Sequence, residues 1–112
     1  MGSTLPLMNK KYHFRFEGVG YDIIYYPDGM MQSECTNADL EHHPSRIGQI
    51  KTLKVNRFEI ANNVWCVYWA TPYINLVYIE DFNKMSVNAI ITQSDLKQIR
   101  QTGVIIDPEE TK

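Results

Sequence analysis

The sequence predicts an all-β domain in which about eight antiparallel strands close into a barrel, with one short helix near the C-terminus. Two observations support the strands: short runs of β-branched and aromatic residues alternate along the chain, and Gly, Pro, Asn and Asp separate these runs. Only residues 94–101 carry helix signals. Short strands joined by hairpins form antiparallel barrels or sandwiches. A barrel of about eight strands holds packed side chains or one small ligand.

The N-terminal half is expected to contain three strands, over residues 12–17, 21–26 and 30–35. The tight turn Pro27-Asp28-Gly29 joins the last two into a hairpin, because proline, aspartate and glycine favour such turns. The polar segment 36–46 is expected to be a long loop.

Strand patterns in the C-terminal half cover residues 48–55, 57–61, 64–71, 73–81 and 86–91, and the first two are separate strands or one long bent pair. Ser94 is a suitable helix N-cap, Leu96 and Ile99 share a helical face, and Gly103 would end the helix. Residues 104–106 would add a final short strand.

Length and composition indicate one domain over residues 1–112, with residues 1–10 and 107–112 expected to be flexible. The formal charge of -2 and the scattered basic residues argue against nucleic acid as a partner. No apolar run approaches the ~20 residues of a membrane span, and the N-terminus lacks the apolar core of a secretory signal. Two cysteines are too few for a disulfide framework. We therefore expect a cytoplasmic protein.

The stretch from Val64 to Phe82 is the most distinctive part of the chain. Side chains alternate between the two faces of a strand, so Trp65, Val67 and Trp69 share one face. That face is broad, apolar and aromatic. It either fills the core or lines a pocket.

The order of several short motifs resembles a known family. A strand ending in tyrosine and an Asp-Gly turn comes first, followed by Arg46-Ile47-Gly48, then Val-Tyr-Trp-x-x-Pro, then Glu-Asp-Phe, then Val-Asn-Ala-Ile-Ile. This order, over about residues 18–106, resembles the lipocalin-like (calycin) barrels of the phenolic acid decarboxylase group and the related MoaF-like proteins. The resemblance implies a calycin barrel. The MoaF-like name implies molybdenum-cofactor biosynthesis but no chemistry that these residues identify.

The decarboxylases of this group carry two tyrosines two positions apart, an arginine after the long loop and a glutamate two residues after the tryptophan. Here the second tyrosine falls on Tyr26, the first falls on Ile24 and the glutamate position falls on Thr71. Arg46 and Arg57 flank the expected arginine position. The resemblance therefore supports the barrel, and phenolic acid decarboxylation is rejected.

If the chain alternates as that fold implies, five side chains point inward: Tyr26, Trp65, Val67, Trp69 and Thr71. They either fill a small barrel or line a ligand site, because aromatic residues dominate protein cores. The candidate ligand-binding residues are Tyr26, Trp65, Trp69 and Thr71, with Arg46 for an anionic group. Tyr26 is the first candidate, since a buried phenol needs a hydrogen-bond partner. No cofactor is expected.

Carboxylates offer a weaker, catalytic possibility. Asp22 shares the strand face of Tyr26 by parity, and Asp81 closes a later strand. A carboxyl group inside a barrel would have a raised pKa and could act as acid or base, whereas one at the rim would simply be solvated. Glu34 and Glu80 are similar, weaker candidates.

His42-His43 suggests a metal site, but no third ligand lies at a diagnostic spacing. We expect a solvated loop there and no metal.

Three functions remain open. The first is binding of a small apolar or aromatic molecule in the barrel mouth. The second is a small lyase, isomerase or cyclase that uses Tyr26 with Asp22 or Asp81 for proton transfer. The third is a homodimeric interaction module formed through a strand edge.

Overall fold

The structure, a computed structural model, describes residues 9–38 and 47–108. These residues form one antiparallel sheet of nine strands. The strands are β1 (Lys11–Phe16), β2 (Val19–Tyr25), β3 (Met30–Ala38), β4 (Ile50–Lys54), β5 (Asn56–Ala61), β6 (Val64–Ala70), β7 (Ile74–Asp81), β8 (Ser86–Gln93) and β9 (Gln98–Ile106).

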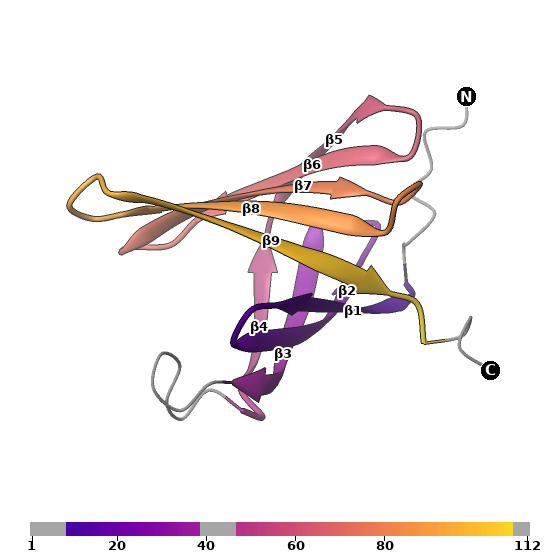
Figure 1. Cartoon of the computed structure of the whole chain (residues 1–112), viewed down its shortest axis with the longest axis horizontal. Helices are drawn as coiled ribbons and strands as arrows, with labels where there is room; N and C mark the ends of the chain where they lie inside the picture. The colour runs from indigo at the N-terminus through magenta and orange to yellow at the C-terminus, as the bar shows by residue number, and fades with distance from the viewer. Residues whose placement is uncertain (1–8, 39–46, 109–112) are drawn as a thin grey trace.

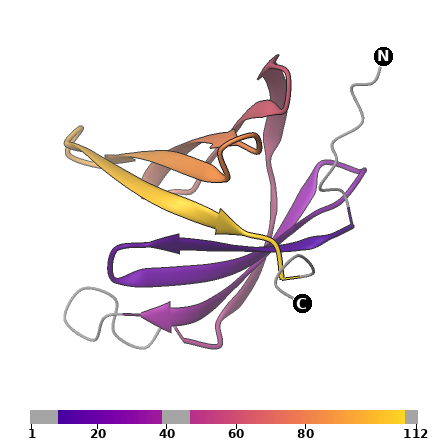
Figure 2. The same cartoon turned by 45° about the vertical axis from the view of Figure 1, so that its right-hand side comes forward.

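The sheet curls into a nearly closed barrel. Its strand order is β4-β3-β2-β1-β9-β8-β7-β6-β5, so most neighbours in sequence are also neighbours in the sheet. The exception is the pairing of β1 with β9, which joins the two ends of the chain. The two outermost strands, β4 and β5, follow each other in the chain with only Val55 between them. The two edges therefore meet at Val55. In Figures 1 and 2 the group β1–β4 lies below the group β5–β9.

We call this meeting point the seam. Here individual hydrogen bonds, rather than a regular ladder of backbone hydrogen bonds between β4 and β5, hold the two edges of the sheet. The Val55 amide donates to the carbonyl oxygen of Gly29 at 2.9 Å. The Arg57 guanidinium, from β5, donates through Nη2 to the carbonyl oxygen of Tyr26 at 2.9 Å. Arg57 thus ties the edge strand β5 to the turn between β2 and β3.

The barrel interior is packed with apolar and aromatic side chains. Alternate residues of each strand point inward, as the period of two along a strand requires. Tyr78 lies at the centre of an aromatic group: its ring centroid is 5.0 Å from that of Trp69 and 5.7 Å from that of Phe16. The other buried apolar residues include Tyr12, Phe14, Val19, Ile23, Tyr25, Met31, Val55, Trp65, Val67, Val87, Ala89 and Ile105.

Strand β9 lies very close to β1 at Gly103. A Cβ atom built on Gly103 would be 2.5 Å from the carbonyl oxygen of Arg15 and 2.7 Å from the Phe16 ring. Only glycine fits here, and its small size lets the first and last strands pair.

The predicted helix over residues 94–101 is wrong, and no residue in the described ranges is helical. Ser94 to Lys97 form the turn between β8 and β9, closed by hydrogen bonds from the Gln93 amide to Lys97 and from the Leu96 amide to Gln93. Residues 98–106 then form one long strand that pairs with β8. Backbone pairing of residues 98–104 with β8 outweighs the weak helical pattern of Leu96 and Ile99.

The sheet has nine strands rather than about eight. The ninth strand arises because the residues on either side of Val55 form two separate strands, β4 and β5, and the expected end strand 104–106 belongs to the full strand β9. The alternative of separate strands around residue 55 is the one observed, since β4 and β5 lie at opposite edges of the sheet. Residues 36–38 of the predicted loop 36–46 belong to β3, which continues to Ala38, and residues 39–46 lie outside the described residues.

Near the C-terminal end of the described residues, Asp107 is buried and accepts a bond from Lys10 Nζ at 2.6 Å. This ion pair joins segments at the two ends of the chain. A search of the described residues for a helix that could span a membrane found none.

Candidate functional site

The indole face of β6 points into the barrel, as the sequence predicts. Trp65 is 6% exposed, Trp69 is 8% exposed and Val67 is fully buried. Both indoles are packed among core side chains. Their predicted contact with a ligand remains a prediction.

Tyr26, the first ligand candidate, does not face the interior. It follows β2, and its hydroxyl donates to the side-chain oxygen of Gln32 at 2.9 Å. Gln32 lies next to Met31, which is 1% exposed and faces inward, so Gln32 belongs to the outer face. The inward tyrosine is its neighbour Tyr25, which is also 1% exposed. The predicted inward direction of Tyr26 is therefore wrong by one residue.

The two aspartates also lie outside the barrel core. Asp22 bonds His13 Nδ1 at 2.9 Å across the β1–β2 pair, where both side chains are partly exposed. Asp81 accepts bonds from the amides of Asn83 and Lys84 and closes the turn between β7 and β8. Both side chains are partly exposed, so the expectation of an aspartate inside the barrel is not met at these positions.

Thr71 likewise has a local role. Its hydroxyl oxygen accepts bonds from the amides of Tyr73 and Ile74 and donates to the Ile74 carbonyl, which fixes the turn between β6 and β7. β6 ends at Ala70, so Thr71 belongs to this turn, and its predicted contact with a ligand remains a prediction. Arg46, His42 and His43 lie outside the described residues.

A buried carboxylate does occur in the barrel, at Glu80. Its side chain is fully buried and accepts a hydrogen bond from the Tyr25 hydroxyl, with Tyr25 Oη 2.5 Å from Glu80 Oε2. Glu80 lies directly opposite Trp65 in the β6–β7 pair. Arg57 completes the group, with its guanidinium carbon 5.5 Å from the centre of the Tyr25 ring. We call these four residues the Glu80 cluster.

Burial keeps the two acids of this cluster protonated. Desolvation raises the pKa of Glu80 to about 8, although the Tyr25 hydrogen bond and the Arg57 charge oppose this rise. Desolvation, with the nearby Glu80 carboxyl, also raises the pKa of Tyr25. At neutral pH the cluster therefore holds a neutral carboxyl and a neutral phenol beside the Arg57 cation.

Three buried polar atoms of this cluster have no hydrogen-bond partner: Arg57 Nη1, Trp65 Nε1 and Glu80 Oε1. Buried polar groups are nearly always paired, so three orphans in one cluster require an explanation.

The sequence contains a signal for the inward direction of Glu80. A hairpin between residues 64–71 and 73–81 turns about Pro72-Tyr73, and that turn places residue 80 opposite residue 65. Residues opposite each other in an antiparallel pair point to the same side of the sheet. Glu80 therefore had to share the inward face of Trp65. The approach of Tyr25 and Arg57 could not be derived in this way, because β2 and β5 pair with neither β7 nor each other.

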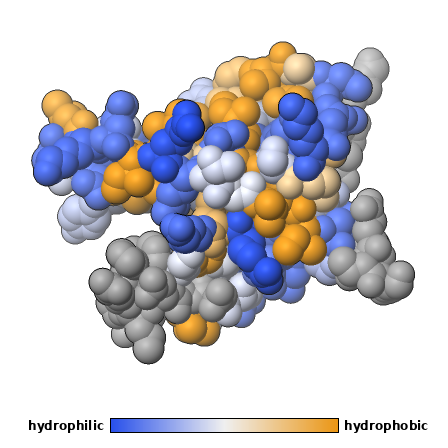
Figure 3. Space-filling view, viewed as in Figure 1, coloured by the Kyte–Doolittle hydropathy of each residue, from blue (hydrophilic) through white to orange (hydrophobic). Residues whose placement is uncertain are grey.

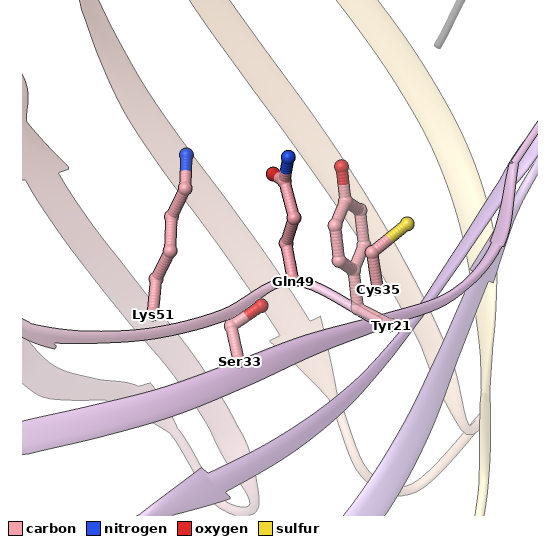
Figure 4. Close-up of a pocket in the computed structure, with 5 residues that line it drawn as sticks. All are labelled: Tyr21, Ser33, Cys35, Gln49 and Lys51. Atoms are coloured by element: carbon pink, nitrogen blue, oxygen red, sulfur yellow. The ribbon is translucent and has the colours of Figure 1, made fainter. Parts of the chain in front are cut away.

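A second feature is a pocket of about 40 Å³, lined by Tyr21, Ser33, Cys35, Gln49 and Lys51. We call it the β2–β4 pocket. Figure 4 shows these side chains projecting to the same side from β2, β3 and the start of β4. The volume accommodates a few water molecules or one small polar group, since one water needs about 10–15 Å³.

Aromatic side chains lie behind the β2–β4 pocket. The Tyr21 phenol is near enough to Tyr78 to contribute, after desolvation, to the raised pKa of Tyr78. Tyr78 in turn contacts Trp69 and Phe16. The pocket thus has mainly polar walls, and its lining residue Tyr21 lies near the buried aromatic group around Tyr78.

Within residues 9–38 and 47–108, no three His, Cys, Asp or Glu side chains are grouped so that they could hold a metal ion.

Comparisons with known proteins relate the chain to one family and one fold. A family described as MoaF-like matches residues 8–106. A crystal structure of a Burkholderia vietnamiensis protein, provisionally described as a beta-lactamase, has a similar fold, with a TM-score of 0.75 and 20% sequence identity. That match covers 89% of this chain and 93% of the other chain. A comparison with curated proteins found no match. At this identity the structural match supports the fold alone.

Proposed function

This chain belongs to the MoaF-like family, and from its geometry we propose that it binds a small organic acid with an apolar or aromatic body. The single observation that supports the proposal is the β2–β4 pocket, where Tyr21 and polar side chains from adjacent strands line a hollow. A protein site that combines polar groups with an aromatic side chain suits an amphipathic small molecule.

The residues of the pocket indicate how such an acid would bind. Lys51 supplies a positive charge for a carboxylate, and Ser33 and Gln49 supply hydrogen-bonding groups. Tyr21 links this polar wall to the aromatic group around Tyr78. Lys51 would thus take the part that the sequence assigned to Arg46.

The size of the pocket limits how deep the ligand enters. A cavity that encloses benzene measures about 150 Å³, whereas this pocket measures about 40 Å³. Only the carboxylate end of the ligand would enter the hollow. Its apolar body would lie at the mouth, rather than between Trp65 and Trp69 inside the core.

A titration of the ¹⁵N-labelled protein with benzoate, followed by amide chemical shifts, tests the proposal. We expect saturable shifts on β2, β3 and β4 around Tyr21, Ser33 and Lys51. Lys51→Met should weaken binding by about fivefold or more, because it removes the charge and keeps the aliphatic length. The matched control is Lys54→Met, which removes an exposed lysine of the same strand on its opposite face. Equal losses in both variants, or shifts that do not saturate, would overturn the proposal.

A second candidate function is proton-transfer catalysis, and the Glu80 cluster is the observation that favours it. A carboxyl whose pKa is about 8 can donate or accept a proton near neutral pH. Tyr25 and Glu80 would act here in place of Tyr26 with Asp22 or Asp81. The test is exchange of the methyl protons of pyruvate for deuterium: catalysed exchange that Glu80→Gln abolishes supports an enzyme, and exchange at the uncatalysed rate contradicts it.

A homodimer remains a prediction of the sequence. The edge strand β5 exposes Phe58 and Ile60, and Phe58 contacts the exposed Tyr68 of β6. On the face drawn in Figure 3, hydrophilic residues separate the hydrophobic surface into several patches. Sedimentation equilibrium at several concentrations would measure the oligomeric state directly.

A further inference from the structure

Strand β5 is an open edge of the sheet. Among the strands that the structure describes, it pairs with β6 alone, so one side of its backbone has no strand ladder. Figure 1 shows it as the outermost strand of the upper group. Five of its six residues are exposed, and Arg57 is half-buried. An exposed edge of this kind offers backbone amide and carbonyl groups with which another strand can pair.

The two faces of β5 differ in their chemistry. Phe58 lies on the outer face, and its ring centroid is 6.2 Å from that of Tyr68, which is also exposed. Arg57 and Glu59 lie on the inward side, because the residues opposite them in β6 belong to the buried core. The edge strand therefore carries an aromatic ring on one face, and one cation and one anion on the other.

We propose that β5 pairs with β5 of a second copy of this chain, in an antiparallel dimer whose two-fold axis passes beside Phe58. Residue 58 of one copy would then lie opposite residue 58 of the other. The proposal rests on the homodimer prediction and specifies the surface and the register of the dimer. It does not involve the β2–β4 pocket.

The charges of β5 favour this register. An added strand that spans the middle of β5 is centred on Arg57, Phe58 or Glu59, and directly opposite residues share a face. Centring on Phe58 places each Arg57 opposite a Glu59 of the other copy, so both charge pairs attract. Centring on Arg57 or on Glu59 would place like charges opposite each other, which destabilises the pair. A register centred between two residues would join the outer face of one copy to the inward face of the other.

The outer face gains an aromatic contact in the same register. The two Phe58 side chains would lie opposite each other across the axis, with their Cβ atoms about 4.5–5.5 Å apart. Each Phe58 ring also has the exposed Tyr68 ring beside it. Removal of these rings from water would add apolar burial to the backbone hydrogen bonds of the new strand pair.

The interface is small, so the dimer should be weak. The six residues of β5, together with Tyr68, are far fewer than the ~20–30 residues that each partner contributes to a stable interface of standard size. We therefore expect a dissociation constant on the order of 10–100 µM, with monomer and dimer in exchange.

Sedimentation equilibrium from about 10 µM to about 1 mM, a range that brackets the expected dissociation constant, tests the association. The mean mass of the wild-type protein should rise with concentration. Phe58→Asp places two like charges at the axis and should abolish this rise. Glu59→Lys should weaken association by about tenfold, because a cation would then face each Arg57.

Matched controls exist for both substitutions. Tyr73→Asp replaces an exposed aromatic residue of the β6–β7 turn, and Glu17→Lys replaces an exposed carboxylate of the β1–β2 turn. Both residues lie outside β5, so these variants should associate as the wild type does. Circular dichroism of each variant establishes that the barrel is folded.

Cross-linking tests the register separately. In Phe58→Cys the two new thiols would lie opposite each other, close to the Cβ separation of a disulfide, so oxidised glutathione should join two chains. Ile60→Cys is the matched variant, because Ile60 and Phe58 are equally exposed, at 49% and 48%. Residue 60 would lie opposite residue 56 and should give little cross-link. The native cysteines are buried, so the wild-type chain should remain unlinked.

The outcomes separate the proposals from one another. A monomeric mass over the whole concentration range would contradict the homodimer and the β5 pairing together. A dimer that survives Phe58→Asp, or equal cross-linking at positions 58 and 60, would overturn the β5 pairing and leave the homodimer standing through another surface. The benzoate titration is independent of both, since no residue that lines the β2–β4 pocket belongs to β5.

Discussion

Replacement of Glu80 by glutamine should change how the stability of this barrel depends on pH. An unfolded chain releases the Glu80 proton near the ordinary pKa of 4.5, whereas the folded barrel holds it until about pH 8. Between these values the folded state binds one more proton than the unfolded state. The free energy of unfolding therefore falls as pH rises through this window.

The size of the effect follows from the two pKa values. They differ by about 3.5 pH units, and each unit corresponds to about 1.36 kcal/mol. Glu80 should thus remove about 5 kcal/mol of stability between pH 4.5 and pH 8. This is a large share of the ~5–15 kcal/mol that holds a typical domain folded.

Glutamine has nearly the same shape and cannot ionise, so Glu80→Gln lacks this loss. We expect the two proteins to differ little near pH 4.5 and the variant to gain by up to about 5 kcal/mol near pH 8. Urea unfolding of both proteins, followed by tryptophan fluorescence at several pH values, measures the difference. Groups common to the two proteins cancel in that comparison.

Glu17→Gln is the matched control, because it removes a solvent-exposed carboxylate from the same barrel. A stability difference between wild type and Glu80→Gln that stays constant within about 0.5 kcal/mol from pH 5 to pH 8 would refute the reasoning. It would mean that Glu80 titrates alike in the folded and unfolded states.

Three further changes test the packing around this group. Tyr25→Phe removes the donor to Glu80, so it should lower the free energy of unfolding by about 1–3 kcal/mol and raise the pKa of Glu80 further. Urea titrations at two pH values measure both effects, and unchanged stability would contradict the assigned hydrogen bond. Gly103→Ala places a methyl group 2.5 Å from a backbone oxygen and should destabilise by at least about 2 kcal/mol. Gly48 has open space around it but a φ of +87°, so Gly48→Ala should destabilise by only about 1 kcal/mol. Thermal unfolding compares the two glycine variants. A greater loss of stability in Gly48→Ala than in Gly103→Ala would contradict the close approach of β9 to β1. Arg57→Lys removes the guanidinium, with its Nη2 bond to the Tyr26 carbonyl and its contact with the Tyr25 ring, and should destabilise by about 1–2 kcal/mol. Faster amide exchange beside the seam, compared with the far side of the barrel, distinguishes this loss from general destabilisation.

The hairpins of this protein were predictable because their signals are local. The turns at Pro27-Asp28-Gly29 and Asn62-Asn63 separate strands that pair in the structure as expected. Turn residues and alternation lie within a few positions of each other, so sequence alone places such strands. The inward face of Trp65 and Trp69 followed from the same periodicity.

The inward face of β2 was not predictable in this way. Its sequence places Ile23 and Ile24, then Tyr25 and Tyr26, side by side, so both faces are apolar. Pairing with β1 and β3 decides the matter and turns Ile23 and Tyr25 inward. A shift of one residue exchanges the two faces, so the sequence alone predicts Tyr26 to face inward in place of Tyr25.

The helix predicted over residues 94–101 failed for a related reason. Two apolar residues three positions apart fit a helix, but the same segment can also form a turn and a strand. The pairing of β9 with both β8 and β1 selects the second alternative. Hydrogen bonds to distant partners are invisible to a local pattern.

The sequence by itself determined that the chain forms short hairpin-linked strands and that the indoles of β6 share one face. Only the tertiary structure decided that β1 closes on β9, and that Tyr25, Arg57 and Glu80 meet in the interior. Alternation and turn chemistry act between near neighbours, whereas Tyr25 and Glu80 are 55 positions apart. Their approach depends on the registers of all the strands between them, which are fixed together when the barrel closes.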